Sequence, residues 1–142
     1  MANFSGVAQT NAIAAPPVNS LPNVQVGRVR VFYDSYTTIA AEDVTVGDTI
    51  TFGAERIPLG ARITSASIQN DGVGGTSAVV SVSVGGVSPI VAADITAAGI
   101  DTITTIGLVT TSAGYPTMEF TTLTADMTDS KVIELQIEYV ID

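Results

Sequence analysis

Apolar and polar residues alternate with a period of two along much of the chain after residue 25. The alternation is clearest in the last segment, Lys131 to Ile141, where the apolar set is Ile133, Leu135, Ile137, Tyr139 and Ile141 and the polar set is Glu134, Gln136 and Glu138. Successive side chains of a β-strand point to opposite faces, so this segment is expected to form a half-buried strand with its apolar set in the core.

Similar patterns predict further strands between turns rich in Gly, Pro and Asp. The first is expected where Val29, Val31 and Tyr33 alternate with Arg30 and Asp34, and others are expected at 48–52, 62–69, 78–84, 102–111 and 118–124. Residues 88–99 are ambiguous, with a short edge strand possible at 89–92 and one helical turn at 93–98. Seven or eight short strands predict an antiparallel β-sandwich or barrel.

Composition favours the same all-β class. Of 142 residues, 51 are Val, Ile or Thr, whose branching at Cβ suits a pleated sheet better than a helix. The length is that of one domain, and we place it at residues 28–142.

Residues 1–27 form a distinct segment. They contain no charged side chain and no periodic pattern, and three prolines at positions 16, 17 and 22 oppose both helix and sheet interior. This composition predicts an extended N-terminal arm that lies along another surface through its apolar residues, Phe4, Ile13, Val18 and Leu21. A frayed terminus is the alternative.

Charge and missing residue types exclude several functions. The formal net charge of −9 argues against nucleic acid and anionic membranes as partners. Without His or Cys, the chain cannot build a Ser-His-Asp triad, a thiol nucleophile or a typical zinc site. We find no secretory signal and no apolar stretch of membrane-spanning length, so synthesis in a cytoplasm is expected.

The acidic residues offer no convincing chemistry. Glu134 and Glu138 are expected roughly 13 Å apart on one strand face, too far for either glycosidase mechanism. Asp71, Asp126 and Asp129 offer oxygen ligands for calcium, but the calcium-binding hand motif is absent and these patterns are ordinary in turns. We therefore expect no enzyme activity, no catalytic residues, no cofactor and no metal.

Five short segments together resemble a known family. They are Val29–Tyr33, Ile39–Val44, Asp48–Ile50, Ile57–Ile63 and Gly75–Ser77. Their aromatic first strand, Ala-x-Asp turn, Pro-x-Gly-Ala-Arg turn and Gly-Thr-Ser strand start are similar to those of the capsid decoration (cement) proteins of tailed bacteriophages. The resemblance covers about residues 28–86 and contains no chemical signature.

The resemblance implies a jelly-roll-like β-sandwich in the virion. Such a protein is made in the host cytoplasm, binds the outside of the phage head and braces neighbouring major capsid subunits. Its partner would be the major capsid protein. The surplus of β-branched residues suggests apolar strand faces beyond one core, so we also expect the chain to bind copies of itself, as a dimer or trimer. Expected contact residues are the four arm residues named above together with Arg28 and Arg30, although the two arginines can equally pair with acids of a neighbouring strand.

Two other functions remain open at this point. A tail, fibre or baseplate β-domain would show the same strand pattern. A carbohydrate-binding module is disfavoured, because only 6% of residues are aromatic and there is no Trp.

Overall fold

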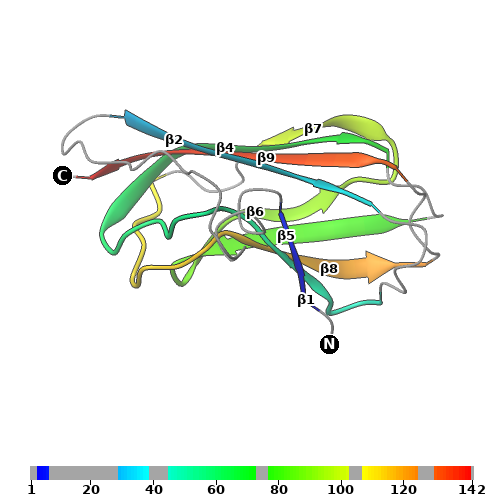
Figure 1. Cartoon of the computed structure of the whole chain (residues 1–142), viewed down its shortest axis with the longest axis horizontal. Coiled ribbons are helices and arrows are strands. Elements are labelled where there is room, and N and C mark those ends of the chain that lie inside the picture. The colour runs from blue at the N-terminus through cyan, green and yellow to red at the C-terminus, as the bar shows by residue number, and fades with distance from the viewer. Residues whose placement is uncertain are drawn as a thin grey trace, which may run out of the picture.

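The structure is a computed structural model, which describes residues 3–6, 29–38, 45–72, 77–102, 107–124 and 130–141. These residues form two β-sheets stacked face to face as two layers (Figure 1). The all-β sandwich predicted from the sequence is therefore confirmed. Among the described residues, no helix has the length and hydropathy needed to cross a bilayer.

In the part of the chain that the structure describes, nine strands build the two sheets. Their bounds are β1 Asn3–Ser5, β2 Val29–Thr37, β3 Thr49–Thr51, β4 Ala61–Asp71, β5 Ala78–Val84, β6 Val87–Asp94, β7 Ala98–Thr102, β8 Thr117–Leu123 and β9 Val132–Ile141. One sheet has the order β1-β3-β8-β5-β6 and the other β2-β9-β4-β7. Every pairing is antiparallel except that of β1 with β3. Within each sheet most neighbouring strands are far apart in sequence, as in β3-β8-β5 and β2-β9-β4. This order agrees with a jelly roll, and the jelly-roll assignment stays a prediction.

The core lies between the sheets and is built mainly of branched aliphatic side chains. Strand β9 buries Ile133, Leu135, Ile137 and Tyr139 of the predicted set, and Ile141 is partly buried against the core. Its neighbour β4 adds Ile63 and Ile68 on the same side of the sheet, and β5 of the opposite sheet adds Val80 and Val82. Full burial of such a side chain contributes about 1.5–3 kcal/mol. The alternation of apolar and polar residues is sufficient to predict which face of these strands is buried, because the buried face packs mainly against apolar side chains of the core.

Strand β2 is half-buried as predicted, but its faces are reversed. Arg30 is 9% exposed, Asp34 2% and Tyr36 5%, whereas the apolar residues Val29 and Val31 point to solvent. Asp34 can be buried because its carboxylate accepts hydrogen bonds from the backbone N–H groups of Gly53 and Ser35, each at 2.8 Å. These hydrogen bonds offset the cost of removing the charge from water.

The middle of the chain also differs from the sequence interpretation. Residues 93–98 form no helical turn, because β6 continues to Asp94 and β7 starts at Ala98. Of the strand expected at 102–111, residues 103–106 lie outside the described residues. In the part that is described, Thr102 belongs to the end of β7, and among residues 107–111 only Val109 makes an isolated bridge, to Arg62. Residues 107–111 therefore do not form the expected strand.

The predicted N-terminal arm is described only at residues 3–6. Here β1 adds to β3, and the Gly6 N–H donates to the Thr51 carbonyl at 2.6 Å. Phe4 packs against the core, with its ring centroid 6.2 Å from that of Tyr36. The boundary at residue 27 stays a prediction.

Candidate functional site

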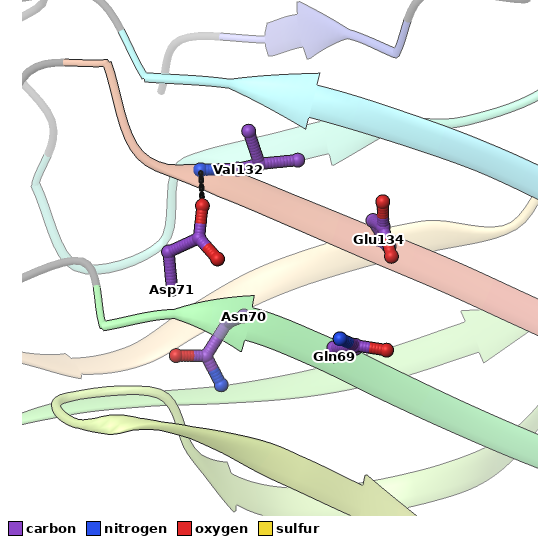
Figure 2. A pocket seen from close by; sticks show the side chains of 5 residues that line it. All are labelled: Gln69, Asn70, Asp71, Val132 and Glu134. Carbon is purple, nitrogen blue, oxygen red and sulfur yellow. Dashed lines mark hydrogen bonds between the residues drawn. The ribbon is translucent and has the colours of Figure 1, made fainter.

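A small hollow lies where β4 ends and β9 begins. Figure 2 shows its lining side chains, which are Gln69, Asn70, Asp71, Val132 and Glu134, and its volume is about 140 Å³. Gln69 and Glu134 are cross-strand neighbours on the outer face of the sheet, which places a carboxylate and an amide side by side. The hollow is polar and partly open to solvent, and its volume is close to that of a cavity that holds a benzene-sized molecule.

Two of the polar side chains in this hollow, Asp71 and Asn70, form hydrogen bonds with backbone groups near the ends of strands. Asp71 accepts a hydrogen bond from the Val132 N–H at 3.3 Å (Figure 2). Asn70 accepts one from the Gly72 N–H at 2.8 Å and donates one to the Gly99 carbonyl at 3.4 Å. Side chains of this kind commonly hold the backbone in turns.

Metal binding gains no support from the described residues. They contain no group of three or more His, Cys, Asp or Glu side chains placed to hold an ion. Of the three calcium candidates, Asp71 bonds to the backbone of β9, while Asp126 and Asp129 lie outside the described residues.

The outer face of β9 carries the other notable carboxylates. Glu134 accepts a hydrogen bond from the Tyr33 hydroxyl at 3.0 Å, and Glu138 accepts one from the Gln136 amide at 3.4 Å. The bond to Glu134 raises the pKa of Tyr33, and partial burial and the nearby negative charges of Glu134 and Asp34 raise it further. Glu134 and Glu138 are two residues either side of Gln136 and do not converge on a common point.

The predicted contact residues fall into three groups. Phe4 is half-buried against its own core. Arg30 is largely buried on the inner face of β2, and its role in partner contact stays a prediction. Ile13, Val18, Leu21 and Arg28 lie outside the described residues.

The structure instead displays an apolar surface that the sequence interpretation missed. Val29 is 60% exposed, and Val31 and Tyr33 are each 55% exposed, all on the outer face of β2. A signal for this orientation exists in the sequence, because the aromatic residues Phe32 and Tyr36 share the face of Arg30 and Asp34. Those aromatic side chains outweigh two valines in the apolar area that they bury.

Comparison with known proteins relates this fold to phage capsids. No protein-family model and no curated protein sequence matches the chain. Among solved structures, a chain of the cyanophage Pam1 capsid asymmetric unit is similar with a TM-score of 0.67 and 18% identity, over 91% of this chain and 96% of that chain. A chain of the capsid of Ralstonia phage GP4 is similar with a TM-score of 0.65 and 18% identity, over 99% of both chains. The structural neighbours of this chain thus come from phage capsids, in agreement with the resemblance to a capsid-associated family at the level of the fold.

Proposed function

We propose that this chain is a virion structural protein, namely a decoration protein that binds the outside of a phage head and stabilises contacts between major capsid subunits. The observation that supports the proposal most is the end-to-end likeness to a chain of the GP4 capsid, which covers 99% of both chains. The likeness therefore includes both sheets of the sandwich.

The surface chemistry of the described residues supports a binding role. The hollow between β4 and β9 is small, and the exposed carboxylates of β9 are spread along a strand rather than gathered. An exposed apolar face on β2 is typical of a surface that meets another protein. We propose that the protein is not an enzyme and acts by adding interface area.

Repetition would make this mechanism effective. A decoration protein is present in many copies on a particle, so modest individual contacts combine through multivalency. We also propose that the protein self-associates as a dimer or trimer. Of the predicted arm, Phe4 packs against the protein's own core. The remaining apolar residues of the arm, Ile13, Val18 and Leu21, are the ones proposed to contact a neighbouring subunit.

Binding to heads that lack the protein tests the proposal. Purified protein should saturate undecorated heads and raise the temperature at which they release DNA, while heads that already carry it should take up no more. Cryo-electron microscopy of the native particle should place the density on the outer surface of the head, over seams between capsid subunits. Density on the tail instead, with no uptake by heads, would refute the decoration role and favour a tail or fibre β-domain.

A further inference from the structure

The outer face of the four-stranded sheet carries a strip of apolar side chains along β2. Val29, Val31 and Tyr33 alternate along this strand and are 60%, 55% and 55% exposed, respectively. They point away from the opposite sheet, because the residues between them point into the sandwich. We call these three side chains the β2 strip. Apolar side chains that gather on an exposed surface commonly mark a contact with another protein.

The β2 strip leads into the hollow between β4 and β9. The Tyr33 hydroxyl donates a hydrogen bond to Oε1 of Glu134 at 3.0 Å, and Glu134 lines the hollow. The register places Glu134 opposite Gln69 of β4. Gln69 and Asp71 are exposed and alternate with the buried Asn70, so they share the outer face with Glu134 (Figure 2). The strip and the hollow therefore form one continuous surface on one side of the sheet.

Two carboxylates make this hollow negative. In the described part of the chain their hydrogen-bond donors are neutral, namely the Tyr33 hydroxyl for Glu134 and the Val132 N–H for Asp71. Each of these bonds reaches one oxygen, whereas a carboxylate can accept about four hydrogen bonds. A partner that covered the hollow without a positive charge would remove both carboxylates from water at a large energetic cost. The hollow therefore favours a lysine or arginine side chain.

The size of the hollow suits the end of such a side chain. A volume of about 140 Å³ is sufficient for an ammonium or guanidinium group, each of which is smaller than benzene. The side-chain amide of Gln69 adds an oxygen acceptor beside the two carboxylates (Figure 2). The charged end can thus be bound in the hollow while neighbouring apolar side chains cover the β2 strip.

We propose that the β2 strip and the hollow together dock a segment of another virion protein that presents apolar side chains and a Lys or Arg on one face, as an amphipathic helix does. The apolar side chains cover the strip, and the basic side chain enters the hollow beside Glu134. A helix places residues three and four positions apart on the same side, so it can present both kinds together. An alternating strand would send them to opposite faces. The inference depends on the proposed function only in placing the partner in the virion.

A second copy of this chain is a poorer occupant of the surface. The chain has 5 Lys and Arg against 14 Asp and Glu, and its net charge is −9. Two copies therefore repel each other at long range, whereas the same field favours encounter with a cationic segment. Self-association through the β2 strip is an outcome that would overturn the proposal.

Two matched helical peptides test the surface without any virion. Both are about 18 residues long and carry leucines on one face at helical spacing. One has lysines along one flank of the leucines, and the other has glutamates at the same positions. The lysine peptide should bind at least tenfold more tightly, and this advantage should shrink as salt is added.

Amide NMR signals show where the lysine peptide binds. Its binding should shift the signals of β2 and of residues 69–71, and should leave those of β6 in place. Equal binding of the two peptides, or shifts confined to other strands, would overturn the proposal. This comparison uses the wild-type protein, so it decides the question even if a variant fails to fold.

Matched variants test the two parts of the surface separately. Val31→Lys in the β2 strip should weaken binding of the lysine peptide at least tenfold, whereas Val91→Lys on β6, where Val91 is 50% exposed, should leave it unchanged. Glu134→Gln keeps an oxygen to accept the Tyr33 hydrogen bond and should also weaken binding at least tenfold. Glu119→Gln removes the same charge from the exposed face of β8 and should leave binding almost unchanged. If the members of each pair behave alike, the proposal is wrong.

Sedimentation tests the competing occupant. The wild-type protein should not use the β2 strip to bind itself, so Val31→Lys should leave its oligomeric state unchanged. A wild-type dimer that Val31→Lys converts to monomer, without peptide binding, would assign the surface to a second copy. Thermal melts of the same samples will show that each variant is folded.

Undecorated heads separate this inference from the proposed function. If the wild-type protein binds heads and only Val31→Lys and Glu134→Gln lose at least tenfold in affinity, both proposals are supported. If the wild type and all four variants bind equally, the surface inference is wrong and the decoration role stands. If the wild type does not bind heads but the peptide results hold, the decoration role is wrong and the surface inference stands.

Discussion

Strands β2 and β9 lie side by side in the four-stranded sheet, yet only the inner face of β2 includes charged side chains. β9 is central and turns Ile133, Leu135, Ile137 and Tyr139 into the core while showing Glu134, Gln136 and Glu138 to solvent. β2 is at the edge; it buries Arg30, Asp34 and Tyr36 and exposes Val29, Val31 and Tyr33. The two strands keep one register over nine residue pairs, so the difference arises from their positions and not from a break in the sheet.

This contrast follows from the positions of the two strands in the sheet. A central strand has neighbours on both sides, and its inner face meets only apolar side chains of the opposite sheet. The inner face of an edge strand lies at the rim of the sandwich, where backbone groups of loops such as Gly53 need hydrogen-bond partners. Asp34 supplies one, and the valines of β2 remain on the solvent side. Stability is thus expected to depend more on the apolar side chains of β9 than on those of β2.

The largest difference in stability is expected between truncating an inward apolar side chain of β9 and truncating an outward one of β2. Leu135→Ala should lower the free energy of unfolding by about 2–5 kcal/mol, because it leaves a cavity in a filled core. Val31→Ala should change it by no more than about 0.5 kcal/mol, because the side chain is already solvated. Denaturant unfolding of both variants provides the measurement. Similar losses would show that the exposed face of β2 contributes to folding and would weaken the contrast.

The next effect concerns the buried carboxylate of β2. Asp34→Ala should cost about 1–3 kcal/mol, because it leaves the buried N–H of Gly53 without its acceptor. Asp34→Asn retains an oxygen for that bond and should cost less. Unfolding curves will rank the three proteins. If Asp34→Ala were as stable as the wild type, the inner face of β2 would not hold the rim of the sandwich.

These differences explain how much of the fold the sequence could predict. Period-two alternation located β9, β5 and β8 because their inner faces are purely apolar and a one-residue error would reverse every side chain. The same argument gave the wrong inward face for β2. Its inward aromatic residues, Phe32 and Tyr36, share a face with two charged residues, so the alternation of valines with charged residues pointed to the opposite face. β7 was misplaced because Ala98–Thr102 has mixed polarity, and its strand character depends on pairing with β4.

The exposure of the candidate contact residues was harder to predict than the fold. The role of Arg30 in partner contact stays a prediction, but its burial could not be predicted from the sequence, since a buried arginine depends on partners that are distant in sequence. The sequence interpretation placed Phe4 on a neighbour because no local pattern links residue 4 to Tyr36, 32 positions later. The exposed valines were missed for the same reason: which face of an edge strand is covered depends on loops and on the opposite sheet.

A smaller effect is expected where β1 reaches β2. Phe4→Leu keeps an apolar side chain but removes the ring that lies 48° from the plane of Tyr36. Aromatic pairs contribute about 0.5–1.5 kcal/mol beyond their buried area, so this is the expected loss in unfolding free energy. Val29→Leu, at an exposed site on the same strand as Tyr36, is the control and should have no effect. An unchanged melting curve for Phe4→Leu would mean that β1 is not coupled to the edge of the other sheet.

The smallest effect tests whether the exposed face of β2 is electrically coupled to β9. The hydrogen bond to Glu134 holds the proton on Tyr33, so the pKa of Tyr33 should lie above 10.0. A raised pKa in the folded state means that this contact stabilises the fold below pH 10 and that the contribution is lost as pH rises through the folded pKa. Carbon-13 NMR of labelled tyrosine side chains, assigned with Tyr33→Phe, measures the titration. Glu134→Gln should return the pKa towards 10.0, whereas Glu138→Gln should leave it in place. If neither variant moved it, Glu134 would not be coupled to the exposed face of β2.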